Sequence, residues 1–212
     1  MSERDLIERR RLSPKPGEDL WIFAYGSLMW NPGFPFLESH PALLRGYHRS
    51  FCVHSEHYRG TREHPGLVLG LDRGGACRGR AYRVDAAHGK TVGDYLHERE
   101  MITGVYEPRW LPVRLLPAAG SPMEVPGRNG RATARTVAAV AYVVDRRHWQ
   151  YRKLAPAQIA DRILRSAGSA GTNLAYLENT VRHLDELGIA EGPLHDLLRL
   201  TAKCRPRGTD HG

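Results

Sequence analysis

The hydrophobic pattern of the chain changes its period at Asp145, and this change constrains the fold more than any other feature. Before Asp145, short apolar stretches stand between glycine and proline turns, which is typical of β-strands. After Asp145, leucine and isoleucine recur at helical spacing. We expect strands at 21–25, 47–54, 66–72, 80–84, 110–116 and 137–144. We expect helices over 156–167 and 174–187, and a third that begins at Pro193.

Strands first and helices last predict an α+β fold with a strongly bent sheet or small barrel. One further helix is expected between the strands, in HGKTVGDYLHEREMITG, residues 88–104. A chain of 212 residues with 41% hydrophobic content suits one domain, which we assign to residues 20–200. Residues 1–19 are expected to form a flexible extension and 201–212 a basic tail. Residues 117–136, rich in Gly, Pro and Arg, are expected to form a long loop.

The net charge of +8 permits contacts with nucleic acid or with anionic small molecules. The arginines are scattered, however, and no zinc finger or aromatic RNA-binding signature accompanies them, so we favour a solvated basic surface over a nucleic-acid site. No apolar run is long enough to span a membrane, and the first residues lack the apolar core of a signal peptide. Cys52, Cys77 and Cys204 match neither a disulfide framework nor a metal pattern. We therefore expect reduced thiols, two of them buried, in a soluble cytoplasmic protein.

The helix expected in 88–104 directs a carboxylate toward the core. Val92, Tyr95 and Leu96 define its buried stripe, and Glu100 lies about 40° from Leu96 on a helix of 100° per residue. A carboxylate in such a place must be paired, neutralised or used in chemistry. Arg99 points near the same stripe, so a structural Glu–Arg pair is the alternative to a catalytic role.

The stretch Tyr25-Gly26-Ser27-Leu28 follows the first apolar strand directly. A glycine there lets a ligand approach the main chain, and successive N–H groups that leave a strand can bind an anion. The alternative is an ordinary turn at a strand end. Common catalytic motifs such as GxSxG, GxGxxG, the phosphate loop and HExxH are absent. His54, His57 and His64 form a cluster whose spacing fits surface histidines better than a zinc site.

Five blocks in chain order resemble the ChaC family of gamma-glutamylcyclotransferases. They are FAYGSLMWNPGF, LLRGYHRSFCVHSEHYRGT, GLVLGLDRGG, REMITGVY and GTNLAYLENTV. The resemblance runs from about Trp21 to Leu198 and implies a cyclotransferase-type α+β fold, a small mixed barrel flanked by helices. It also implies cleavage of glutathione to 5-oxoproline and cysteinylglycine without metal or cofactor. No nucleic-acid or membrane partner is implied, and the oligomeric state is left open.

The resemblance also implies roles for particular residues. Glu100 matches the essential glutamate of the family, and Tyr176 is similar to a substrate-contacting tyrosine. The turn motif falls on Tyr25, Gly26, Ser27 and Leu28, whose main-chain donors would hold the gamma-glutamyl group. From its place in HYRGT, Arg59 is a candidate partner for a substrate carboxylate, with a surface ion pair as the alternative. Cyclisation of other gamma-glutamyl amines and a non-catalytic basic binding protein are the competing functions.

Overall fold

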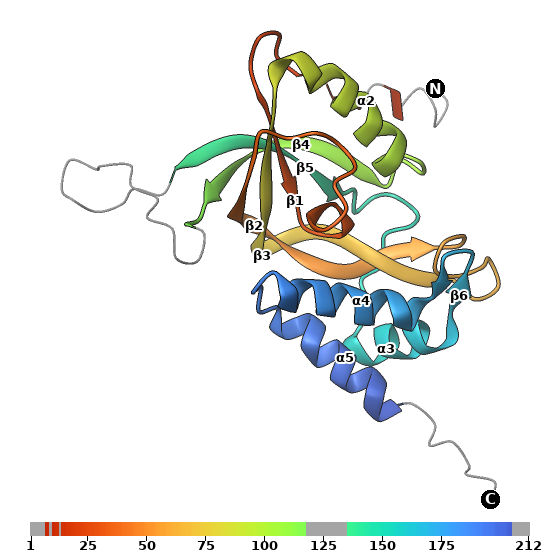
Figure 1. The fold of residues 1–212 in the computed structure, drawn as a ribbon. Helices are drawn as coiled ribbons and strands as arrows, with labels where there is room; N and C mark the ends of the chain where they lie inside the picture. Colours follow the sequence, from red (N-terminus) through yellow and green to blue (C-terminus); the bar gives the residue numbers. More distant parts are fainter. Residues whose placement is uncertain (1–6, 9, 13, 118–134, 205–212) are drawn as a thin grey trace, which may run out of the picture. The chain divides into compact units, whose positions relative to one another are not determined.

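A computed structural model of the chain describes residues 7–8, 10–12, 14–117 and 135–204 (Figure 1). The chain divides into two compact units, unit 1 with residues 1–49 and 71–149 and unit 2 with residues 50–70 and 150–212. The strands are β1 (Leu20–Ala24), β2 (Glu38–Ser55), β3 (Gly66–Val84), β4 (Tyr106–Leu115), β5 (Thr136–Val144), β6 (Ala167–Gly168) and β7 (Gly171–Thr172). The helices are the single turns η1 (Ser27–Met29) and η2 (Ala86–His88), followed by α2 (Gly89–Glu100), α3 (Pro156–Arg165), α4 (Asn173–Glu186) and α5 (Gly192–Cys204).

The five long strands form a closed barrel in the order β1-β3-β2-β4-β5 (Figure 1). β1 pairs antiparallel with β3 and parallel with β5, where Ile22 lies opposite Val140 and completes the closure. Closure removes the open sheet edge, which would otherwise present unpaired N–H and C=O groups. β1 is buried at all five positions, as its continuous apolar sequence requires. The predicted α+β fold with a small barrel is confirmed.

Two strand predictions are corrected by the structure. The segments 66–72 and 80–84, predicted as separate strands, belong to the single strand β3, and β2 begins at Glu38, nine residues before the predicted start. Glycines explain both errors. Gly74 and Gly75 have φ of +106° and +69°, and Gly46 in β2 has φ of +85°. Glycine adopts these angles without steric cost, so the backbone bends inside a paired strand where the sequence pattern indicates a turn.

The N-terminal residues that the structure describes pack against unit 1. Leu12 is buried, and the Arg10 guanidinium donates to the Gly104 carbonyl at 3.0 Å and to the Asp145 carboxylate at 3.0 Å. Pro14 lies beside Gly89 and Gly93, one turn apart on α2, at a distance where a Cβ on either glycine would make an ordinary contact with it. The boundaries predicted at residues 19 and 200 stay predictions. Residues 118–134 of the predicted loop and 205–212 of the predicted tail lie outside the described residues.

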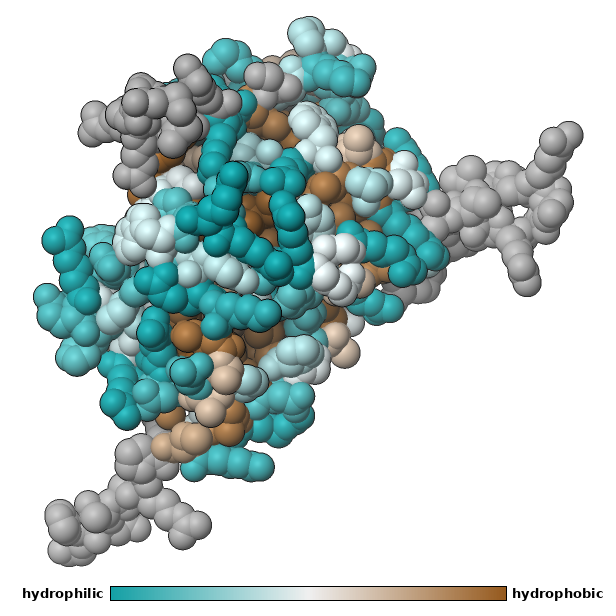
Figure 2. All heavy atoms as spheres, turned by 180° about the vertical axis from the view of Figure 1, so that it is seen from behind, coloured by the Kyte–Doolittle hydropathy of each residue, from teal (hydrophilic) through white to brown (hydrophobic). Residues whose placement is uncertain are grey.

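Hydrophilic side chains cover most of the face drawn in Figure 2, with hydrophobic residues visible between them. Within the described ranges, no helix is long and apolar enough to cross a membrane. Cys52 and Cys77 are buried free thiols and Cys204 is an exposed one, as predicted. The exposed large apolar side chains come from separate segments: Phe36, Leu37, Tyr58, Ile102, Trp110 and Trp149.

In unit 2, α3, α4 and α5 pack against one another, and α4 begins with a fully buried asparagine. The Asn173 side chain accepts a hydrogen bond from the Leu67 N–H at 2.7 Å and donates one to the Leu67 carbonyl at 2.7 Å. It therefore satisfies both the N–H and the carbonyl of Leu67 in β3. The predicted helix over 156–167 ends earlier, at Arg165, because residues 167–172 form the β6–β7 hairpin.

We predict that Asn173→Ala lowers the free energy of unfolding by about 2–6 kcal/mol, because it leaves two buried backbone groups without partners at roughly 1–3 kcal/mol each. Urea denaturation followed by circular dichroism measures the change. Asn179→Ala is the matched control: Asn179 is exposed on the same helix, where it accepts a hydrogen bond from Arg182, and its loss should cost less than about 0.5 kcal/mol. Equal losses in the two variants would contradict the bridging role of Asn173.

Candidate active site

The chain leaves β1 through a single helical turn that begins the candidate site. Ala24 ends the strand, and the Met29 N–H donates to the Gly26 carbonyl at 2.8 Å to form η1. The first N–H groups of any helical turn have no acceptor within it, so those of Ser27 and Leu28 are the donors the turn can offer. Gly26 has φ of −129°, an angle open to any residue, so a left-handed backbone is not the reason for a glycine here.

A buried arginine supports this turn from within unit 1. Arg49 is only 2% exposed, and its Nε donates to the Tyr25 carbonyl at 2.5 Å, while its Nη2 donates to the carbonyl of Arg78 and approaches the Met29 sulfur. Buried charge is costly unless hydrogen bonds compensate it, and these carbonyls provide that compensation. The sequence analysis missed Arg49. Its signal was present, because Arg49 stands between Tyr47 and Phe51 at alternate positions of the predicted strand 47–54, and alternate residues of a strand face the same side.

Glu100 is the last residue of α2, and its side chain is 19% exposed. Burial raises the pKa of the Glu100 carboxyl above its ordinary value, and the positive charge of Arg99 opposes that rise. The negative end of the helix dipole also disfavours a carboxylate at a helix C-terminus. The pKa of Glu100 is therefore closer to neutral pH than the pKa of a solvated glutamate.

Arg99 joins Glu100 to the strand-end turn. Its Nε lies 3.3 Å from Glu100 Oε1, and its Nη2 donates to the Ser27 hydroxyl at 3.0 Å. Its Nη1 donates to the Tyr95 hydroxyl at 2.7 Å and to the Asn31 carbonyl at 2.8 Å. The Glu–Arg pair foreseen as an alternative to catalysis exists, and the same guanidinium brings two predicted site residues together.

Tyr142 of β5 is a neighbour of Glu100 that the sequence analysis did not single out. The phenol is buried, and burial together with the nearby charge of Glu100 raises its pKa well above the usual range. Tyr142 therefore keeps its proton at neutral pH and can act only as a neutral hydrogen-bonding group. In the sequence, the sign of its importance was its phenolic hydroxyl, the single polar side-chain group of the apolar strand 137–144.

Two further predicted site residues, Tyr176 and Arg59, meet in unit 2. The Arg59 guanidinium lies over the Tyr176 ring at 5.1 Å, and its Nη1 donates to the Ala170 carbonyl at 2.5 Å. The Tyr176 ring packs edge-on against Phe51 at 5.6 Å, and its hydroxyl lies 3.5 Å from the Leu69 N–H. In the part of the chain the structure describes, Arg59 has no ion pair, so the alternative of a surface ion pair is not observed.

The described residues contain no cluster of three histidine, cysteine or carboxylate side chains that would hold a metal ion. His57 and His64 of the predicted surface cluster are exposed, while burial and the charges of Arg152 and Arg162 lower the pKa of His54. The substrate-binding roles of Tyr25, Gly26, Ser27, Leu28, Arg59 and Tyr176 stay predictions at this point. The catalytic role of Glu100 also stays a prediction.

We predict that Glu100→Gln stabilises the protein increasingly as pH rises above about 4.3, the ordinary pKa of a glutamate. A carboxyl whose pKa is raised by folding contributes stability below its unfolded pKa and loses it as pH rises through the folded pKa. The neutral amide avoids that loss. Denaturant unfolding of both proteins at several pH values measures the difference, with Glu98→Gln as the control for removing a charge from the exposed face of α2. A difference that stays constant with pH would contradict the prediction.

Comparisons with known proteins agree with this fold and identify the family. The family described as "ChaC-like protein" matches residues 20–204. The chain is 39% identical over 203 residues to a glutathione-specific gamma-glutamylcyclotransferase of Escherichia coli K12, covering 93% of this chain and 81% of that protein. It is 34% identical over 161 residues to glutathione-specific gamma-glutamylcyclotransferase 1 of Mus musculus, covering 74% of this chain and 66% of the mouse protein.

A solved structure shows the same fold. The crystal structure of a gamma-glutamyl cyclotransferase specific to glutathione from yeast superposes with a TM-score of 0.74 at 21% identity, covering 89% of this chain and 97% of that one. At this identity the likeness concerns the fold. The family match and the curated relatives go further, and the chain belongs to the ChaC-like family.

Proposed function

We propose that the protein is a gamma-glutamylcyclotransferase that converts glutathione to 5-oxoproline and cysteinylglycine. The observation that carries the proposal is a buried carboxyl, Glu100, with a raised pKa, tied through Arg99 to a turn with outward main-chain donors. The activity named for the Escherichia coli and mouse relatives supports the same reaction. A cytoplasmic location, expected from the sequence, is part of the proposal.

The reaction needs no enzyme nucleophile because glutathione contains one. The alpha-amine attacks the gamma-carbonyl carbon, a C–N bond forms to close a five-membered lactam, and the amide bond to cysteine breaks. One proton leaves the attacking amine and one is delivered to the departing nitrogen, so the balance requires no water or redox partner. Intramolecular reactions of this kind reach effective molarities of about 10⁵–10⁸ M when the groups are aligned, so holding the bent conformer is much of the task.

Glu100 is the proposed carrier of the proton. An alpha-amine with a pKa of about 8 is mainly ammonium at neutral pH and must lose a proton before it can attack. A carboxylate with a raised pKa accepts that proton more readily than a solvated one and then returns it to the leaving amine. The pair with Arg99 keeps a useful fraction of Glu100 ionised, because the positive charge favours the carboxylate.

The turn after β1 carries the substrate contacts proposed in unit 1, and Arg59 and Tyr176 carry those proposed in unit 2. The N–H groups of Ser27 and Leu28 suit an anion, and glutathione offers two: its alpha-carboxylate and the oxygen that becomes negative during ring closure. Both assignments stay open. Arg59, whose described hydrogen bonds go to carbonyls, retains a charge for a substrate carboxylate, and its guanidinium lies over the Tyr176 ring.

Purified protein incubated with glutathione should release 5-oxoproline, measured by chromatography, and chelator treatment should leave the rate unchanged. A competition among glutathione, gamma-glutamyl-alanine and gamma-glutamyl-lysine separates a glutathione enzyme from a cyclotransferase for other gamma-glutamyl amines. Absence of product with all three substrates, together with salt-sensitive nucleic-acid binding, would favour the non-catalytic alternative.

We predict that Glu100→Gln lowers the rate of 5-oxoproline release by about 10²–10⁴-fold, the usual contribution of a positioned general acid or base. Glu98→Gln, which removes a carboxylate from the exposed face of the same helix, should keep at least about half of the rate. A Glu100→Gln enzyme with full activity would overturn the assignment of the base. The stability measurement proposed above shows whether the variant is folded.

We further predict that Arg99→Gln moves the acid limb of the kcat/KM profile to higher pH, because loss of the positive charge raises the pKa of Glu100 further. Arg99→Lys keeps the charge, so the acid limb should stay closer to its wild-type pH. The rate should still fall, because lysine cannot make the several hydrogen bonds of the planar guanidinium. If both variants have a lower rate but an unshifted pH profile of kcat/KM, Arg99 has a structural role and does not tune the pKa of Glu100.

A further inference from the structure

Unit 1 contains a cavity of about 540 Å³ that no step of the proposed reaction uses. Leu20 and Trp21 line it at the start of β1, whereas the candidate active site follows the end of that strand. The other walls come from the N-terminal segment, from Trp110 on β4 and from the beginning of β5. Binding sites for small organic molecules commonly enclose about 300–1,000 Å³, so this cavity has room for a one- or two-ring compound.

One wall of the cavity is an indole that the fold leaves uncovered. Trp110 is 46% exposed, although the neighbouring lining residues Val137 and Ala138 belong to the same apolar sheet. Large aromatic side chains are usually buried or used for contact, because their surface gains most from leaving water. Trp21 adds a second indole to the lining. This part of the cavity therefore suits a planar ring that stacks on Trp110.

The charges of the cavity pair with one another except at one point. Asp19 accepts from Arg83 at 2.7 Å, and Glu18 lies 3.3 Å from the Lys15 ammonium. Arg83 also pairs with Glu38, at 2.5 Å. Arg135, by contrast, has no carboxylate partner among the described residues. Its guanidinium lies 5.4 Å from the Trp21 ring, a position held by a cation–π contact.

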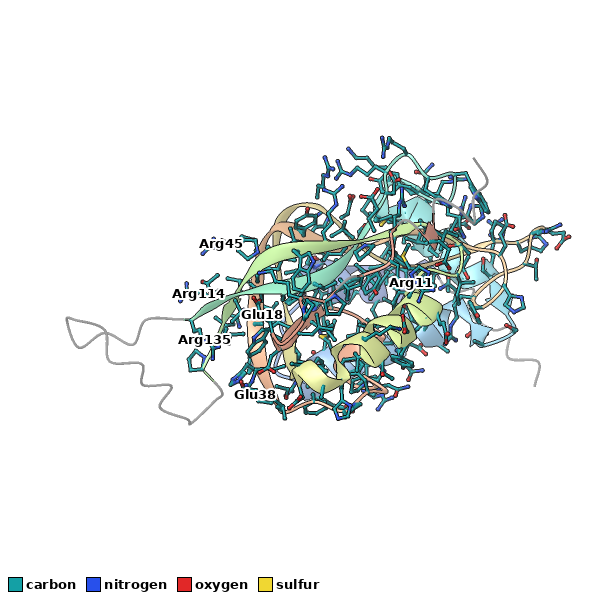
Figure 3. All side chains as sticks on the ribbon, turned by 90° about the horizontal axis from the view of Figure 1, so that it is seen from above. Arg11, Glu18, Glu38, Arg45, Arg114 and Arg135 are labelled. Carbon is teal, nitrogen blue, oxygen red and sulfur yellow. The ribbon has the colours of Figure 1, made fainter. Side chains whose placement is uncertain are left out.

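The surroundings of Arg135 reinforce its positive potential. Figure 3 shows Arg45, Arg114 and Arg135 gathered at one end of the strands, with Glu18 and Glu38 along the same side of the molecule. Arg45 and Arg114 are exposed and likewise lack an ion pair in the described part of the chain. An anion that approaches Arg135 therefore meets several cations without a described ion pair, whereas Glu18 and Asp19, which also line the cavity, disfavour a second negative charge.

We propose that this cavity binds a planar aromatic molecule that carries a single carboxylate. The ring stacks on Trp110, and the carboxylate pairs with the Arg135 guanidinium, which can donate two parallel hydrogen bonds to it. This inference is independent of the proposed cyclotransferase activity.

Three probes test the three requirements of the site on the full-length chain. Indole-3-acetate has both a planar ring and a carboxylate, indole-3-acetamide has the ring without the charge, and cyclohexylacetate has the charge without a planar ring. Titrations followed by the indole N–H resonances in ¹H–¹⁵N spectra report binding and locate it, with Trp110→Phe used to assign the Trp110 signal. We expect that signal to shift with indole-3-acetate and the other two probes to bind at least about tenfold more weakly, a difference of about 1.4 kcal/mol.

Variants separate direct contact from general attraction. Trp110→Ala and Arg135→Gln should each weaken indole-3-acetate binding at least about tenfold, whereas Arg114→Gln, the matched loss of a nearby charge that does not line the cavity, should weaken it less than about threefold. Unchanged indole signals from Trp30 and Trp149, which do not line the cavity, show that each variant is folded. The proposal is overturned if indole-3-acetate fails to bind at millimolar concentration, if the amide binds equally well, or if Arg135→Gln binds like wild type.

Discussion

The ionic contact between Arg99 and Glu100 is the interaction on which the candidate site depends. Burial disfavours the charged form of this carboxyl, and in the part of the chain that the structure describes the charge of Arg99 opposes that effect. The same guanidinium holds Ser27 through a hydrogen bond. Electrostatic tuning of the base and placement of the turn are therefore two effects of one side chain. Because Arg99 contacts both Glu100 and Ser27 at about 3 Å, a change at one of these residues affects the other.

Much of the fold could be predicted from periodicity. Five elements lie near their predicted positions: the strands β1 and β5 and the helices α2, α4 and α5. The errors share a cause. At Gly46, Gly74 and Gly75 the sequence shows a turn signal, but partners elsewhere in the barrel keep the backbone paired through the bend. Local patterns carry no information on such long-range pairing, so glycine inside a strand and glycine between strands look alike.

The candidate site was predictable only in part. Glu100 stood out because its place on the helix stripe is a local property, and the turn after β1 because it interrupts a clean strand. Arg49 and Tyr142 were missed because their importance lies in contacts with distant segments, with the Tyr25 carbonyl and with Glu100. The resemblance to known cyclotransferases supplied Tyr176, which periodicity alone would have left as a half-buried helix residue.

The parallel pairing of β1 with β5 fixes which residues of the two strands lie side by side. Since β1 and β5 run in the same direction from Ile22 opposite Val140, two further residues along each strand bring Ala24 level with Tyr142. The turn that follows β1 and the phenol beside Glu100 therefore emerge at the same end of the barrel. A one-residue slip of β5 would replace Tyr142 with a residue whose side chain faces the other way. Barrel register thus sets the composition of the site as well as the stability of the sheet.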